Sequence, residues 1–221
     1  MGRPVKTRRY DSPRRSAAAA QTKADVIEAA RRLFLADGYE RTTLGAVAEA
    51  ARVSVATVKA IFANKAGLVA AVRDAALAGD VDSVALADRD WYVRIIDEPD
   101  PIAKLGSFAR AIAAIHQRAA EIHLLVRDAG VSDEEMAKLW RLEHEQRREG
   151  MAGVVRSMRA QGTLRKGLSV ETATATLWVL SDPGSYWLLT DVGGWSVKMY
   201  TAWLRRTMVD ALCEESAPPS A

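Results

Sequence analysis

The stretch from Thr42 to Lys65, with the sequence TTLGAVAEAARVSVATVKAIFANK, carries residues whose types and spacing suit contacts to DNA. Hydroxyl groups, lysines and small side chains gather there. Hydroxyl and ammonium groups bind phosphates, and small side chains let a helix approach base edges in a groove. A helix pair must position these groups.

Thr42 and Thr43 can cap a first short helix, whose apolar residues recur at helical spacing as far as Ala51. Arg52 lies at the turn, with Val53 as a buried anchor. The next residue, Ser54, is a suitable N-cap for the second helix. The spacing predicts two helices joined by a tight turn.

The second helix, from Val55 to Phe62, is expected to have two faces. Val58, Ile61 and Phe62 should face inward. Because the outward residues are mostly small, its first turns fit a major groove about 12 Å wide. An ordinary αα-hairpin has the same spacing, so the pair alone does not decide for DNA binding.

The distribution of charge favours the DNA-binding interpretation. Residues 1–73 hold 14 Lys and Arg against 6 Asp and Glu, whereas residues 74–221 hold 17 against 22. A basic N-terminal third is the electrostatic footprint of phosphate neutralisation. We expect residues 1–19 to be a disordered basic arm, because Pro4 and Pro13 oppose a helix, with Arg3 placed to enter a minor groove. The alternative is a solvated charged terminus.

The pattern resembles the DNA-binding domain of the tetracycline-repressor (TetR) family of bacterial transcription regulators. The matching positions are Val26, Ile27, Ala30, Leu33, Phe34, Gly38–Tyr39, Thr42–Thr43, Val47–Ala48, Ala51, Val53–Thr57, Phe62, Lys65 and Leu68. The resemblance implies phosphate contacts from Thr43 and Lys65, a place at the groove for Thr57 and Lys59, and a contact of Ala56 with a base methyl. The full candidate DNA-binding set is Arg3, Thr42, Thr43, Ser54, Val55, Ala56, Thr57, Lys59 and Lys65.

Three positions depart from the family pattern. Arg52 replaces the usual glycine of the turn, Lys59 replaces a usual tyrosine, and Ile61 replaces an aromatic residue or histidine. Arg52 must therefore adopt a left-handed conformation at some cost or shift the turn. Lys59 keeps a donor for phosphate, whereas Ile61 cannot donate, and the basic arm could make up the electrostatics.

The whole chain of 221 residues is expected to be all-α. We predict a helix-turn-helix domain over 20–66, an effector-binding and dimerisation domain over 67–215, and a tail over 216–221. Ser132 to Glu135 reads as a capping box. Helices are predicted over 65–78, 91–96, from 101 through about 127, from the capping box to about 160, from Ser169 to about 189 with an interruption at Pro183-Gly184, and between 195 and 213.

Other features exclude several classes of protein. The sequence has no signal peptide, no internal repeat and no apolar run of about 18 residues that could span a membrane. The single Cys213 allows no intrachain disulfide. We therefore expect a cytoplasmic protein with no membrane partner.

All six Trp lie outside the predicted DNA-binding domain. The last two helices carry more apolar surface than two helices at the end of a bundle need. We expect this surface to pair across a two-fold axis, as the resemblance also implies, and to present two reading helices to a near-palindromic operator of double-stranded DNA. The candidate dimer residues are Leu177, Leu180, Leu188, Trp195, Met199 and Trp203.

The resemblance also implies an effector cavity in the C-terminal helices. Polar or amphipathic groups on otherwise apolar helices are its candidate lining, and Asp182 could instead accept backbone N–H groups at the helix interruption. A core role is equally open for each Trp residue, and a satisfied core histidine is favoured over a ligand for both His116 and His123. The candidate ligand-binding residues are His116, His123, Trp140, Trp178, Asp182 and Tyr186.

An enzyme is the main alternative, and its candidate catalytic residues would be the three His together with Glu121, Asp128 and Glu143. No catalytic motif has the required spacing, and Glu143-His144-Glu145 reads as a solvated face. A third interpretation is a DNA-coating protein without sequence preference. We expect a homodimeric, effector-responsive regulator, a repressor released by a small, largely apolar molecule, with no catalytic residues, metal or cofactor.

Overall fold

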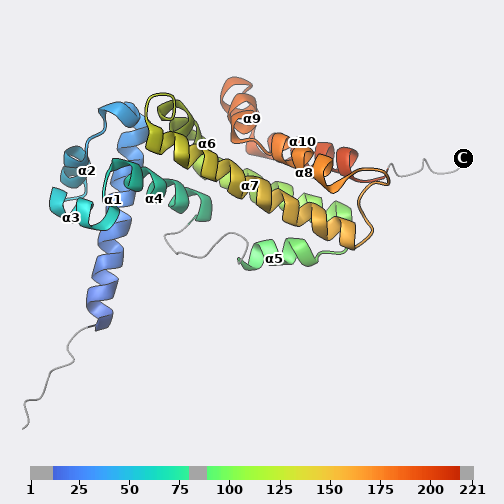
Figure 1. The fold of residues 1–221 in the computed structure, drawn as a ribbon, viewed down its shortest axis with the longest axis horizontal. Helices are drawn as coiled ribbons and strands as arrows, with labels where there is room; N and C mark the ends of the chain where they lie inside the picture. The colour runs from blue at the N-terminus through green and yellow to red at the C-terminus, as the bar shows by residue number, and fades with distance from the viewer. Residues whose placement is uncertain (1–11, 80–88, 215–221) are drawn as a thin grey trace, which may run out of the picture. The chain divides into compact units, whose positions relative to one another are not determined.

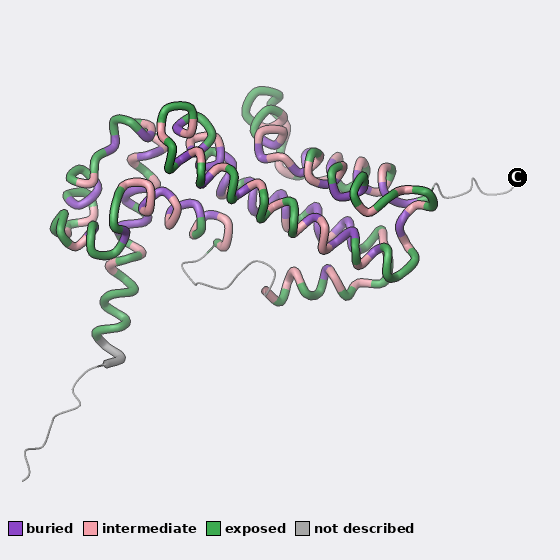
Figure 2. Tube along the Cα trace, in the orientation of Figure 1, coloured by how far each residue is buried: buried purple, intermediate pink, exposed green. Residues whose placement is uncertain are grey.

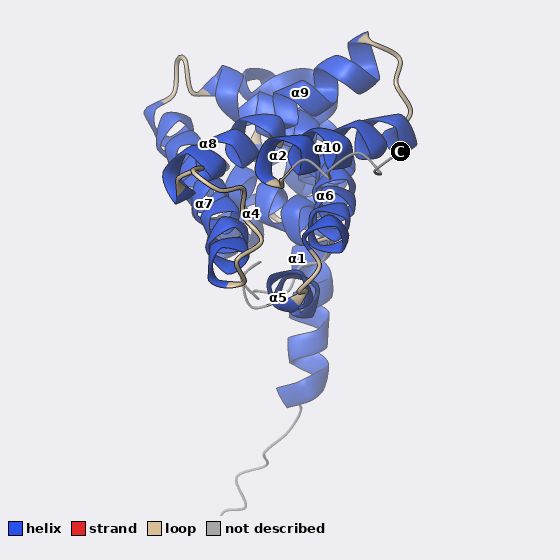
Figure 3. Ribbon diagram, turned by 90° about the vertical axis from the view of Figure 1, so that its right-hand side faces the viewer, coloured by secondary structure: helices blue, strands red, loops and turns tan. Residues whose placement is uncertain are grey.

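The computed structural model describes residues 12–79 and 89–214. Within these ranges every regular element is a helix, as Figure 3 shows, so the expected all-α class is confirmed. The chain divides into two compact units, residues 1–72 and 73–221. The division therefore falls inside a helix, between Val72 and Arg73, and not at the predicted boundary of 66 and 67.

The described residues of the N-terminal unit form three helices and the first half of a fourth (Figure 1). The expected disordered arm of residues 1–19 is wrong for residues 12–19, which are helical. Pro13 lies in the first helical turn, where proline is tolerated, and the alanines that follow favour a helix. The helices are α1 (Ser12–Arg41), α2 (Leu44–Ala50), α3 (Val55–Phe62) and α4 (Lys65–Ala78).

The turn between α2 and α3 keeps its geometry although Arg52 replaces glycine. Arg52 has a φ of 57°, its N–H donates to Glu49 O at 3.0 Å, and the N–H of Val53 donates to Ala48 O at 2.9 Å. These two hydrogen bonds form a Schellman motif, which normally has glycine at this position. The strained alternative left open by the sequence is therefore the one adopted.

The C-terminal unit contains seven further elements. Pro183 begins a new helix and does not interrupt a continuous one. Asp133, and not the predicted Ser132, caps the helix that follows it, because its carboxylate accepts from Glu135 N and Met136 N. The elements are α5 (Asp90–Asp97), α6 (Pro101–Ala129), α7 (Glu134–Ala160), α8 (Val170–Leu180), α9 (Pro183–Trp187), the π-helical η2 (Leu188–Val192) and α10 (Val197–Leu212).

The core of the C-terminal unit lies along α6. This helix packs against α7, α9 and α10, while α7 also packs against α8. Buried positions recur along α6 and α7 as stripes (Figure 2). Of the predicted α6 stripe, Leu105, Phe108, Ile112 and Ile115 are buried, whereas Ile102 is 41% exposed.

Lys104 of α6 is fully buried and joins three helices. Its Nζ donates to Ile96 O at 2.8 Å, Ser157 Oγ at 2.7 Å and Gln161 Oε1 at 2.8 Å. Burial lowers the pKa of this ammonium group. Three acceptors satisfy all three of its donors and compensate for its removal from water.

Among the described residues no single helix is both long and apolar enough to cross a membrane. The pair α3 and α4, bent by 68°, passes that test only when the two helices are taken together.

The strain at Arg52 can be measured. We expect Arg52→Gly to raise the free energy of unfolding by about 0.5 kcal/mol, since relief of the Cβ clash gains about 1–2 kcal/mol and the freedom of unfolded glycine costs about 0.5–1 kcal/mol. Arg52→Ala keeps the Cβ atom and should give no such gain. Urea unfolding followed by circular dichroism tests both variants, and equal stability of the two would contradict the strain.

Candidate DNA-binding helix pair and buried polar cluster

The two faces of α3 are separated largely as the sequence predicts. Val58 and Phe62 are buried, at 0% and 7% exposure, whereas Val55, Ala56 and Lys59 are exposed and Thr57 is half-buried. Ile61, predicted to face inward, is 38% exposed. Three successive positions on the surface of α3, from Lys59 to Ile61, therefore face solvent.

Hydroxyl groups cap both helices of the pair. Thr43 Oγ1 accepts from Ala46 N at 3.1 Å, and Ser54 Oγ accepts from Thr57 N at 3.0 Å. Ser54 Oγ and Thr57 Oγ1 are also 2.8 Å apart, so one hydroxyl donates to the other. Because each hydroxyl has one proton, Thr43 and one member of the Ser54–Thr57 pair keep an O–H for an outside acceptor such as a phosphate oxygen.

Thr42 has a different role from the one expected. It is 2% exposed, and its hydroxyl lies 2.8 Å from Gly38 O and 3.2 Å from Leu33 O. Its proton is therefore used inside the protein, between α1 and α2. The candidate assignment of Thr42 to DNA binding is wrong, and Arg3 lies outside the described residues.

Lys65 is held by the end of α1. Its Nζ donates to Glu40 O at 3.2 Å and lies 4.1 Å from the centre of the Tyr39 ring. The cation stabilises the start of α4 through the carbonyl and the ring face. A phosphate contact from this half-buried side chain has to compete with these two partners.

Five of the six candidate ligand-binding residues carry rings, and the structure places these rings in two groups of neighbouring side chains in the C-terminal unit. His123 of α6 lies 4.5 Å from the Trp140 ring and 5.7 Å from the His144 ring, and His144 lies 5.5 Å from the Trp178 ring. His116 lies 5.5 Å from Tyr186. We call the residues around the first group, His123, Trp140, Glu143, His144, Arg147 and Trp178, the polar cluster.

Two of these residues overturn the expected solvated face on α7. Glu143 is 2% exposed and its Oε1 lies 2.5 Å from His123 Nδ1, while His144 is half-buried. Burial and the nearby charge of Arg147 lower the pKa of His144. The spacing of Trp140, Glu143, His144 and Arg147 at i, i+3, i+4 and i+7 places them on one face of a helix and could have revealed the cluster.

Arg147 is the most connected member of the polar cluster. Its Nη2 donates to Ser181 O at 2.7 Å and to Trp178 O at 3.3 Å, and its Nη1 lies 3.3 Å from Asp182 Oδ2. Asp182 also accepts from Gly184 N at 2.8 Å, as an N-cap of α9, which confirms the capping alternative for this residue. Asp182 therefore contacts the polar cluster through its ion pair with Arg147.

His116 lies beside Tyr200, a residue that the sequence did not single out. His116 Nδ1 is 3.1 Å from Tyr200 Oη. Burial and then the charge of Arg147 lower the pKa of His116 to about 3, so this imidazole is neutral at physiological pH. Among the described residues no group of three His, Cys, Asp or Glu side chains could hold a metal ion.

The candidate dimer residues fall into two sets. Leu177 is fully buried inside its own unit, so its assignment to a dimer surface is wrong. Leu188 and Met199 are 56% and 52% exposed, and Leu180, Trp195 and Trp203 are half-buried. The sequence analysis missed three exposed apolar residues in the same elements, Val179, Trp187 and Val192.

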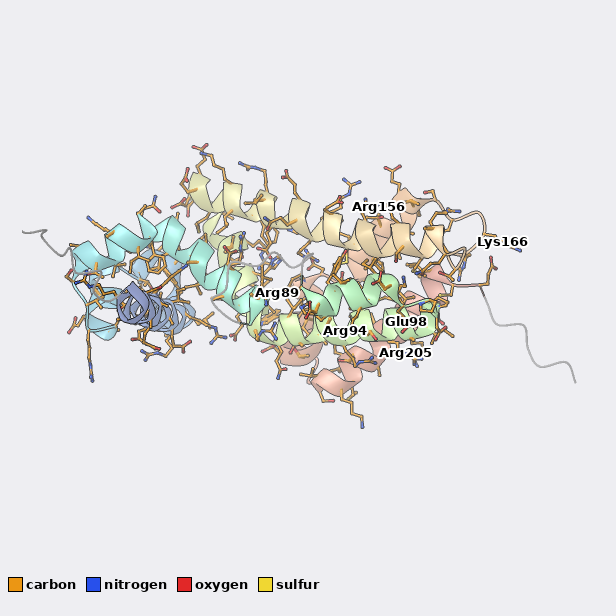
Figure 4. The ribbon with its side chains drawn as sticks, turned by 90° about the horizontal axis from the view of Figure 1, so that it is seen from below. Arg89, Arg94, Glu98, Arg156, Lys166 and Arg205 are labelled. Carbon is orange, nitrogen blue, oxygen red and sulfur yellow. The ribbon has the colours of Figure 1, made fainter. Side chains whose placement is uncertain are left out.

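Several charged side chains of the C-terminal unit that Figure 4 labels are exposed. These are Arg94, Arg156, Lys166 and Arg205. They contrast with the buried Glu143 and the half-buried Arg147 of the polar cluster.

Comparison with known proteins finds a match between part of the chain and one protein family. Residues 26–72 match the family described as bacterial regulatory proteins, tetR family. No curated protein matches the chain in a sequence search. The matched segment contains the helix pair described above.

Solved structures extend the likeness to the rest of the chain. A TetR-family regulator from Mesorhizobium loti has 17% identity and a TM-score of 0.68, covering 89% of this chain and 98% of its own. A regulator from Saccharomonospora viridis in complex with choline has 17% identity and a TM-score of 0.66 over 88% and 99%. NalD of Pseudomonas aeruginosa, the secondary repressor of the MexAB-OprM multidrug efflux pump, has 19% identity and a TM-score of 0.64 over 89% and 98%.

At these identities the structures show a shared fold. That fold combines an N-terminal helix-turn-helix unit with a helical C-terminal unit, and the similar structures include TetR-family transcription regulators. The family match itself covers residues 26–72, the segment that contains the helix pair α2 and α3.

The difference between Thr42 and Thr43 is testable. Thr42→Val should lower the free energy of unfolding by about 1–2 kcal/mol, because it leaves the Gly38 carbonyl unpaired in the interior. Thr43→Ala should cost about 1 kcal/mol through loss of the N-cap. Urea unfolding measures both effects. If Thr42→Val proved neutral, the buried hydrogen bond would have no structural role.

Proposed function

We propose that this protein is a homodimeric TetR-family repressor that binds a near-palindromic operator and is released by a small, largely apolar effector bound in the C-terminal unit. The proposal contains no catalytic step. The single observation that carries it is the outward face of α3, where exposed small residues and Lys59 follow a Ser54 cap.

The DNA-binding surface is proposed to combine groove and phosphate contacts. The first turn of α3 carries no side chain larger than valine on its outward face, so it fits a major groove. The free hydroxyl protons and Lys59 provide donors for phosphate oxygens. The proposed set is Thr43, Ser54, Val55, Ala56, Thr57, Lys59 and Lys65.

Exposed apolar side chains support a dimer. Val179 of α8, Leu188 and Val192 of η2, and Met199 of α10 are all more than half exposed, at 63%, 56%, 62% and 52%. Apolar side chains gathered on consecutive elements mark interaction surfaces in soluble proteins. A second copy of the chain across a two-fold axis would cover them and place the two α3 helices about 34 Å apart on DNA.

Two observations support the effector. The polar cluster places amphipathic rings and buried charges inside a helical unit, which is the character of a ligand site. The structurally similar regulator from S. viridis was solved with choline. A ligand releases the operator only if it binds the DNA-competent and DNA-incompetent states unequally.

Fluorescence anisotropy with the intergenic DNA beside the protein's own gene tests the DNA-binding part. We expect a preference for this duplex over a scrambled one of about 10³ or more. Lys59→Ala should weaken binding about tenfold and reduce the slope of log affinity against log salt by about 1, because one phosphate contact is lost.

Lys166→Ala is the matched control, because Lys166 is an exposed lysine of the C-terminal unit (Figure 4). It should leave affinity and slope unchanged. Equal, salt-sensitive binding to both duplexes would favour a DNA-coating protein, and an unchanged slope for Lys59→Ala would remove Lys59 from the surface.

The dimer is tested by the mass in solution. The wild-type protein should sediment with twice the mass of the chain. Leu188→Glu should give monomers, because two carboxylates would be buried in the interface without partners. Val131→Glu changes an 89% exposed residue outside these elements and should leave the dimer intact. A monomeric wild-type protein would contradict the dimer.

A further inference from the structure

We propose that the polar cluster selects an effector with a hydrogen-bond donor, an amine or a hydroxyl on an aromatic or alkyl body, and that Glu143 Oε2 accepts this hydrogen bond. The inference rests on the proposed function, since it names the chemical class of the effector for the same unit. We further propose that the polar cluster excludes a ligand of the same shape that carries a carboxylate in place of the amine or hydroxyl.

Two buried polar atoms of the cluster have no partner. They are Glu143 Oε2 and Trp178 Nε1. The Glu143 side chain is 3% exposed, so bulk solvent does not reach it. Buried polar groups are nearly always paired in native proteins, because an unpaired one costs the free energy of its desolvation. An unpaired acceptor and an unpaired donor in one cluster indicate a bound group that supplies the complement.

The chemistry of Glu143 fixes the polarity of that group. Its Oε1 is already paired with His123 Nδ1 at 2.5 Å. An ionised carboxylate only accepts hydrogen bonds, so Oε2 requires a donor. A ligand carboxylate at the same point would place two acceptors and two negative charges together.

The cation of the cluster offers no compensation to an anionic ligand. Arg147 uses Nη2 on the Trp178 and Ser181 carbonyls and Nη1 on Asp182. Its charge is therefore matched by Asp182 before any ligand binds. Trp178 Nε1 remains as one neutral donor for a second, acceptor group on the ligand.

The aromatic rings of the polar cluster determine which body and which head group of the ligand are favoured. Trp140 and His144 meet edge to face at 4.1 Å between ring centres, and Trp178 continues the series beyond His144. All three side chains are half-buried, whereas His123 and Glu143 are buried. The rings thus form the outer layer of the cluster and the carboxylate the inner layer. Aromatic faces accept an apolar body and favour a cationic head over an anionic one.

The test uses the full-length dimer and three probes of one shape: 2-phenylethylamine, 2-phenylethanol and phenylacetate. Binding is measured by Trp fluorescence and by the shift in Tm at about 10 mM probe, a concentration that detects weak fragments. We expect the amine and the alcohol to bind and raise Tm, and phenylacetate to bind at least about tenfold more weakly. Equal binding of phenylacetate, or no binding of any probe, would overturn the proposal.

Glu143→Gln separates recognition from packing. The amide keeps an oxygen for His123 and presents an N–H in place of Oε2, so the order of the probes should reverse, with phenylacetate above the amine. Glu145→Gln, the same change at an exposed position of α7, should keep the wild-type order. If Glu143→Gln fails to fold by circular dichroism, the wild-type probe order still decides. An unchanged order in a folded Glu143→Gln protein would refute the role of Oε2.

Operator binding is measured separately on the same samples. Specific DNA binding without any probe selectivity would refute only this inference. Probe selectivity without specific DNA binding would refute the proposed repressor and leave the ligand class standing.

Discussion

The organisation of the C-terminal unit depends on how Arg147 satisfies the break between α8 and α9. The last carbonyls of a helix have no donors within it, and here Trp178 O and Ser181 O lie at such an end, with Ser181 fully buried. Arg147 reaches both carbonyls from α7 and pairs with Asp182, which caps α9. A buried guanidinium is retained because it serves several acceptors at once. Burial and, after it, the charge of Arg147 lower the pKa of His116 and of His144.

The N-terminal unit shows how closely structural and DNA-binding roles overlap. Thr42 and Thr43 are adjacent and chemically identical, yet the first uses its proton on a buried carbonyl and the second keeps its proton for solvent. Ser54 Oγ accepts from the Thr57 N–H as a cap, and of the two hydroxyl protons of Ser54 and Thr57 one lies between the two oxygens and the other is left for the surface. A hydroxyl can accept for the helix and donate outward at once, so the caps of α2 and α3 need no separate residues for phosphate.

Local signals in the sequence predicted most of the helices, because caps, prolines and apolar spacing act within a few residues. Ser169 caps α8, and Asp100 with Pro101 begins α6. The errors lie where tertiary packing decides. Leu177 is buried on α8, which packs against α7 and α10, Thr42 is buried and bonded to the preceding α1, and Ile61 is left exposed. The charged neighbours of Glu143 in the sequence predicted an exposed side chain. The contact of its Oε1 with His123 Nδ1 at 2.5 Å arises from the packing of α6 on α7, which local sequence does not reveal. Pro13 was misread because proline is compatible with a first helical turn.

The polar cluster and the exposed apolar surface meet in α8. Trp178 joins the cluster through His144, and its neighbour Val179 is 63% exposed among the apolar residues proposed for the dimer. Consecutive residues of a helix point about 100° apart, so α8 presents one to the interior and the other to the surface. A ligand that moves the Trp178 ring must displace α8 or strain its packing, because interiors are close-packed. The same rigid helix therefore carries both the proposed recognition of the effector and a proposed contact between subunits.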